Sequence, residues 1–198
     1  FGGIFPARTA LYFLAPAKGR VRWIVPYLVI GAALGMPTWA GDGNPLYYFP
    51  FLLAAFLIGY GGRLAARLVV GMIFFEWIIA WSMIVDTRAV LPGSAGYWGA
   101  MAWKLAMWAA VWLLMRRVFR DSKQVALSGR LWALLGLLAL SPLLSELAFS
   151  MWDIRAYTLD GTDALIDAAF YTLLPFVFVS AIALLFAVVL LSRHQALE

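Results

Sequence analysis

Six long apolar stretches, separated by short polar segments, dominate the pattern of hydrophobic and polar positions along this chain. Most approach or exceed the roughly 20 residues that a helix needs to cross the ~30 Å hydrocarbon core of a bilayer. We therefore predict an all-α, polytopic membrane protein, with a bundle of about six transmembrane helices in a single domain over residues 1–198. The predicted spans are 23–39, 46–60, 64–85, 97–115, 131–151 and 168–191.

The two ends of this pattern need separate interpretation. Residues 1–22 precede the six-helix bundle of residues 23–192, and we expect them to form a cytoplasmic or interfacial segment with a short helix near residues 9–15 that ends at Pro16. The second span is short and contains Pro50 within an aromatic cluster, so it is expected to be tilted, broken or partly re-entrant.

Composition supports a lipid environment, since 65% of the residues are hydrophobic and only 13% are charged. Such a chain cannot cover a water-facing surface with polar groups. The net charge of +5 would suggest nucleic acid in a soluble protein, but most of the 15 basic residues lie in alternate loops and at the termini. The intervening loops carry aspartates instead. By the positive-inside rule we expect both termini in the cytoplasm, a bacterial inner membrane, contact with anionic lipid and no nucleic-acid partner.

The residue types that support most cofactor chemistry are scarce. Cysteine is absent, and the one histidine, His194, lies close to the C-terminus. We therefore expect no disulfide, no metal site and no cofactor. The sequence also lacks a phosphate-binding loop and a zinc-protease motif, so an enzymatic activity is not expected.

Three charged residues interrupt the predicted spans: Glu76, Lys104 and Glu146. Counting 1.5 Å of rise per residue from the basic residues at the cytoplasmic ends places them about 13, 18 and 24 Å deep, respectively. Ionisable groups at this depth are costly and are normally paired, functional or both. Together with Trp108 and Ser145, they form the candidate ligand or ion site, which is expected to face outward.

Two interpretations of this cluster remain open. Lys104 could pair with either carboxylate and hold the third, fourth and fifth spans in register as a structural clamp. Alternatively, the acid left over could be protonated, bind a cation or meet a cationic ligand. Small residues predict close helix packing elsewhere, in Gly31-x-x-x-Gly35 and in a row on the fourth span that comprises Gly99, Ala102, Ala106 and Ala110.

Residues 48–63, with the sequence YFPFLLAAFLIGYGGR, form an aromatic-Pro start, a short Ala/Leu-rich helix and a Gly-Arg turn. This stretch resembles one found in bacterial multi-helix integral-membrane sensor domains that precede histidine kinases or diguanylate cyclases. The resemblance covers about one helix and its turn. It implies a cytoplasmic output domain after the last helix.

The sequence is therefore compatible with three classes of function. The first is a non-enzymatic sensory or regulatory input domain, whose helices shift when a small ligand or ion binds near Lys104 and Glu146. The second is a small-solute transporter or a substrate-capture membrane subunit. The third is an accessory structural subunit of a larger membrane complex. Independently of these functions, a homodimer or a larger membrane complex is a possible assembly of the chain.

Overall fold

The computed structural model describes residues 3–19, 22, 24–35, 45–84, 95–119, 127–156, 179–180, 183–184, 186–191 and 194. Of these residues, 84% are helical, which confirms the predicted all-α class. The elements in chain order are α1 (Ile4–Ala10), β1 (Ala15–Pro16), α2 (Ile24–Gly35), α3 (Pro45–Gly59), β2 (Tyr60–Gly61), α4 (Leu64–Ile84), α5 (Ala95–Val118) and α6 (Gly129–Ala156).

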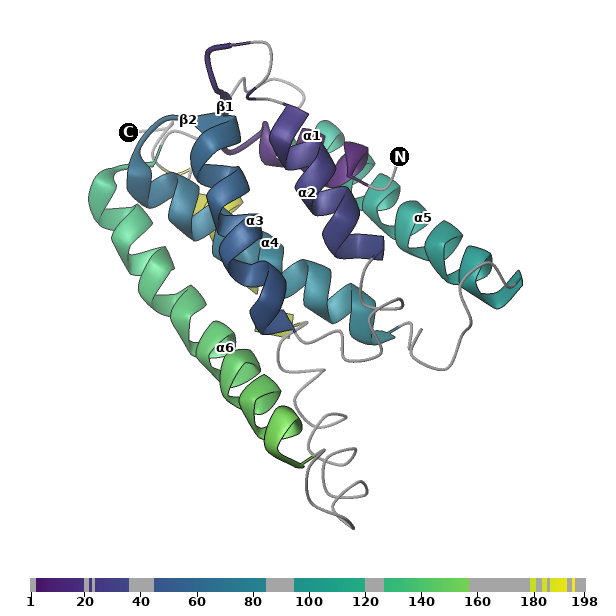
Figure 1. Ribbon diagram of the computed structural model, residues 1–198. Coiled ribbons are helices and arrows are strands. Elements are labelled where there is room, and N and C mark those ends of the chain that lie inside the picture. The colour runs from purple at the N-terminus through teal and green to yellow at the C-terminus, as the bar shows by residue number, and fades with distance from the viewer. Residues whose placement is uncertain are drawn as a thin grey trace.

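The long helices lie side by side as a bundle, with α3 and α4 in the middle (Figure 1). Helix α4 packs against α6 and α3, and α3 also packs against α2. The short α1 contacts both α2 and α5 and so links α5 to the rest of the bundle. Interlocking aromatic rings fill the centre, with Phe56 contacting Phe74 and Phe49 contacting Phe75 between α3 and α4.

Helices α2 to α6 each coincide with one of the first five predicted apolar spans to within five residues at either end. Helix α3 runs through Pro50 as one continuous element, so the chain does not break there. Of the sixth predicted span, residues 179–180, 183–184 and 186–191 are described, and all are helical. The earlier part of that span lies outside the described residues.

Within the described part of the chain, one helix, α5, is long and apolar enough to cross a membrane by length and composition. Three shorter apolar helical segments accompany it: Ile24–Ala33, Tyr48–Gly59 and Gly129–Ser145. The helical elements are thus established, whereas a bundle of six membrane spans stays a prediction.

The N-terminal segment differs from the prediction. Its helix is α1 rather than residues 9–15, and the chain turns after Ala10 into strand β1. Helix α1 is largely buried, because Gly3 approaches α2 so closely that a methyl group on it would lie 2.9 Å from the backbone nitrogen of Gly31. The predicted close packing at Gly31 is therefore confirmed, with Gly3 as its partner.

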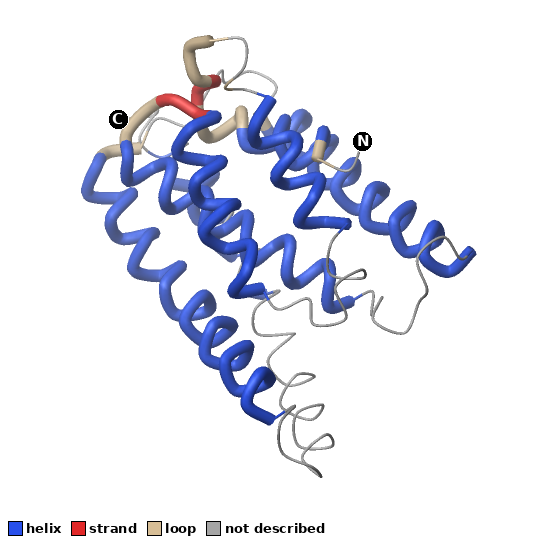
Figure 2. Tube along the Cα trace, in the orientation of Figure 1, coloured by secondary structure: helices blue, strands red, loops and turns tan. Residues whose placement is uncertain are grey.

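A two-stranded antiparallel pair joins the N-terminal segment to the α3–α4 connection (Figure 2). In this connection Gly62 adopts a φ of +104°, which favours glycine.

The last carbonyl groups of α3 find donors nearby: Gly59 O accepts from Ala17 N at 3.1 Å, and Leu57 O accepts from Arg67 Nη1 at 2.6 Å. The Tyr60 hydroxyl donates to Ala7 O at 2.8 Å and ties this turn to α1. The orphan carbonyls of two helix ends are thus satisfied in one compact connection.

The small-residue row on α5 is not a packing surface in this structure. All four of its members are exposed, and a methyl group added to Gly99 would meet nothing within 4 Å. The predicted tight packing of this row is therefore wrong for the described residues. The opposite face of α5 points inward, as the buried Lys104, Trp108, Val111 and Met115 show.

Candidate functional site

Glu76 is the most completely buried charged residue in the described chain, with 0% of its surface exposed. Neither of its carboxylate oxygens has a hydrogen-bond partner among the described residues. Glu76 follows Val69 by seven residues, or about two helical turns, so the two share one face of α4. Val69 packs against Gly136 of α6, where a methyl group on the glycine would lie 3.1 Å from Val69 Cγ2. Glu76 therefore lies on the side of α4 that faces α6.

The register between α4 and α6 identifies what lies opposite Glu76. Both helices begin at the same end of the bundle, since Gly129 lies near the guanidinium of Arg63. Moving seven residues along each helix from the Val69–Gly136 contact brings Glu76 level with Pro142 and its neighbour Leu143, both of which are buried. Pro142 has no N–H, so the carbonyl one turn earlier loses its helical donor. Glu76 therefore lies level with the proline in α6.

Lys104 and Trp108 lie one turn apart on the inward face of α5, with exposed fractions of 2% and 1%. The Trp108 ring packs on α4 through Phe74 and Trp77, at centroid distances of 5.7 and 5.6 Å. Its indole nitrogen is buried and has no hydrogen-bond partner among the described residues. Both residues are therefore buried, and Trp108 lies where α5 meets α4.

The predicted pairing of Glu76 with Lys104 is not formed, because the Glu76 carboxylate accepts no hydrogen bond from it. Helical geometry gives the reason. At about 100° per residue, Glu76 points about 160° away from Phe74 and about 100° away from Trp77, the residues of α4 that meet Trp108. The structure therefore places Lys104 and Trp108 between α4 and α5, and Glu76 between α4 and α6.

Ser145 and Glu146 complete the predicted set. The Ser145 hydroxyl donates to Ser141 O at 2.9 Å, a local bond within α6 that leaves its hydrogen committed to the helix. Glu146 belongs to α6, but its side chain lies outside the described residues. No group of three histidine, cysteine, aspartate or glutamate side chains suited to a metal ion occurs in the described ranges.

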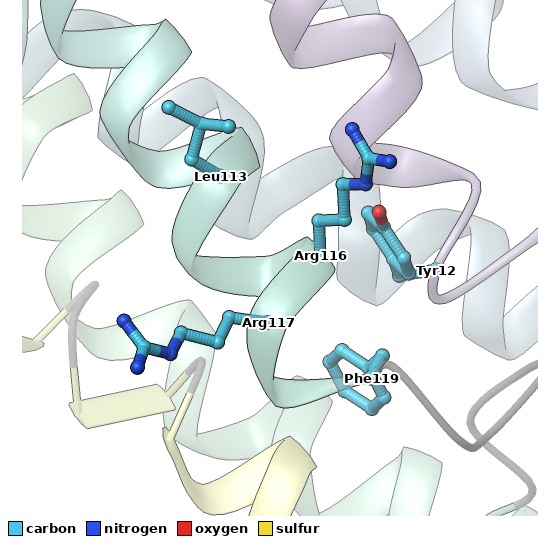
Figure 3. A pocket seen from close by; sticks show the side chains of 5 residues that line it. All are labelled: Tyr12, Leu113, Arg116, Arg117 and Phe119. Carbon is cyan, nitrogen blue, oxygen red and sulfur yellow. The ribbon is translucent and has the colours of Figure 1, made fainter.

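A second feature, which the sequence did not predict, is an open hollow beside the end of α5. It is lined by Tyr12, Leu113, Arg116, Arg117 and Phe119 (Figure 3). In the sequence, the two arginines indicate only the orientation in the membrane. Nothing in the sequence connects Tyr12 with Phe119, because they are far apart along the chain. In the structure their rings stack at 5.6 Å.

A scan against protein-family models found no matching family, and searches of curated proteins and of solved structures found no match either.

Proposed function

We propose that this chain is a non-enzymatic membrane domain with a sensory or regulatory role, in which exchange of a proton or a small cation at Glu76 shifts the helices. The observation that carries the proposal is the fully buried Glu76, whose two oxygens have no hydrogen-bond partner among the described residues. A lone buried carboxylate costs several kcal/mol unless it is neutralised or paired. A chain that keeps one in its core is therefore suited to a response that neutralises it.

Exposed apolar side chains support the membrane setting. Along the outer face of α6, Leu134, Leu137, Leu138 and Leu144 are between 50% and 67% exposed. In α5, only 28% of the most apolar 18-residue stretch is buried. An apolar helix at the centre of a soluble protein would be mostly covered, and continuous exposed leucines are unfavourable in water. Lipid is the solvent in which these surfaces are stable.

The position of Pro142 suggests how neutralisation is transmitted. A helix interrupted by proline has a weaker local hydrogen-bond ladder and is a common place for bending. Glu76 lies level with this interruption in α6. A charged Glu76 favours a geometry that admits water or a cation, whereas a neutral Glu76 favours close contact of α4 with α6. The population of the two geometries then follows the state of one carboxyl group.

Substitution of Glu76 by glutamine tests this proposal, because the amide keeps the shape of the side chain and cannot ionise. We expect the melting temperature of the purified wild-type protein in detergent micelles to change between about pH 5 and about pH 9, or between sodium and choline chloride, and that of E76Q to stay constant.

Thr9→Ala is the control, since it removes a buried hydroxyl that donates to Phe5 O within α1 and leaves every ionisable group in place. It should respond to pH and sodium as the wild type does. A response that E76Q retains in full would overturn the proposal. Measurements in liposomes separate sensing from transport: a proton or sodium flux that E76Q abolishes would establish the transporter alternative instead.

A further inference from the structure

The hollow at the end of α5 lies where the predicted fourth span, residues 97–115, gives way to basic residues. Its volume is about 670 Å³, which is within the range of small-molecule sites. One wall comes from the last turns of α5 and the other from the turn that follows α1. Two segments about 100 residues apart in sequence therefore form a single surface.

Two polar groups of this surface are held in place by aromatic rings. The Arg116 guanidinium lies 5.6 Å from the centre of the Trp112 ring, and the Tyr12 ring stacks on Phe119. Arg116 and Tyr12 lie side by side in Figure 3, whereas Arg117 extends to the other side of α5. Within the described part of the chain, no carboxylate pairs with either guanidinium. Arg116 and Tyr12 thus present preorganised donors without an anion.

The same hollow has an apolar side. Leu113 lies one turn before Arg116 and is 55% exposed, and the adjacent Leu114 is 48% exposed. A ligand that filled the hollow would therefore meet cationic donors at the helix end and an apolar strip toward the predicted membrane interior. Free inorganic phosphate would use only the first of these.

We propose that this hollow binds one anionic phospholipid, with its phosphate against the Arg116 guanidinium and the Tyr12 hydroxyl and an acyl chain along Leu113. Arginine suits a phosphate geometrically as well as electrostatically. Basic pockets at the cytoplasmic ends of membrane helices are suited to anionic head groups. The inference rests on the proposed membrane location but is independent of Glu76.

Binding of phosphatidylglycerol and phosphatidylcholine to the detergent-purified protein, followed by native mass spectrometry, tests the assignment. We expect wild type to bind phosphatidylglycerol more tightly, and R116Q to lose about tenfold of that affinity. Y12F should lose less, because only one hydrogen bond is removed. Addition of inorganic phosphate distinguishes the two anion sources, and it should not displace the lipid.

Arg130→Gln is the control, because it removes the same charge from an exposed arginine at the start of α6 that does not line the hollow. It should weaken phosphatidylglycerol binding much less than R116Q does. Equal losses in R116Q and R130Q would show diffuse attraction to basic residues and overturn the site, as would equal binding of the two lipids or displacement by inorganic phosphate. Because both arginines are exposed, neither variant should affect folding, and the Glu76 response should persist in both.

Discussion

Single glycines set how closely the helices of this bundle approach one another. Gly59, the last residue of α3, lies against Pro26 of α2, and a methyl group on it would come within 2.1 Å of the proline Cγ. The proline ring is fixed to its backbone and cannot rotate away. Gly99 has nothing within 4 Å of the corresponding position. A larger side chain would therefore clash at position 59, whereas it would fit without contact at position 99.

We predict that Gly59→Ala destabilises the protein by about 1–3 kcal/mol through overpacking against α2. Gly99→Ala should be neutral or stabilise α5 by about 0.5–1 kcal/mol, since alanine is the better helix former. Thermal unfolding of the two variants in the same detergent checks both expectations. A Gly59→Ala protein as stable as the wild type would show that α2 and α3 are further apart than described here.

The burial of these charged residues was predictable from sequence, whereas the direction of each side chain was not. Counting along the predicted spans from their basic ends places Glu76 and Lys104 in the interior, and both are buried. That count contains no information about the rotation of one helix relative to the next. Rotation is set by contacts such as Val69 with Gly136 and Phe74 with Trp108, which join residues far apart in sequence. Of the two partners that the sequence offers Lys104, Glu76 does not pair with it, and the side chain of Glu146 lies outside the described residues.

At the scale of whole elements, the long apolar runs defined α2 to α6 because each ends near glycine, proline or charged residues. Helix α1 was misplaced because it is only seven residues long and contains Pro6 and Arg8, so it has no long apolar pattern. Its proline lies in the first turn, where the missing N–H costs little. The contact of Gly3 with α2 and the bond from Tyr60 stabilise α1, and neither is visible in local sequence.

The α4–α6 interface positions Glu76, and it is testable by cross-linking because the chain has no cysteine of its own. We expect the V69C/G136C variant to form an intramolecular disulfide under mild oxidation, since these positions are in direct contact and disulfides need Cβ atoms about 4 Å apart. Protection from alkylation, measured by mass spectrometry, reports the bond. V69C/G99C is the control and should remain fully alkylated. Cross-linking of the control but not of V69C/G136C would contradict the helix order described here.

At the scale of the whole molecule, basic residues gather at one end of the bundle. Lys18 follows β1, and Arg63 follows β2 and lies beside the start of α6. Arg116 lies in the last turn of α5, next to Tyr12. Among the described helices, this clustering follows when consecutive helices run in alternating directions across the bundle. The proposed orientation, with both termini in the cytoplasm, predicts that basic residues collect at one end.

Cysteine labelling tests this orientation in a bacterial inner membrane. With a membrane-impermeant maleimide, Lys18→Cys and Arg130→Cys should react in inverted vesicles and not in intact spheroplasts. Ser94→Cys, between the third and fourth predicted spans, should show the reverse. The physical reason is that moving arginine-rich segments across the bilayer is costly, so the loops that carry them stay on the side of synthesis. Labelling of Lys18→Cys and Ser94→Cys from the same side would remove the alternation on which the six-span arrangement depends. It would also place the Arg116 hollow away from the interface that its proposed lipid requires.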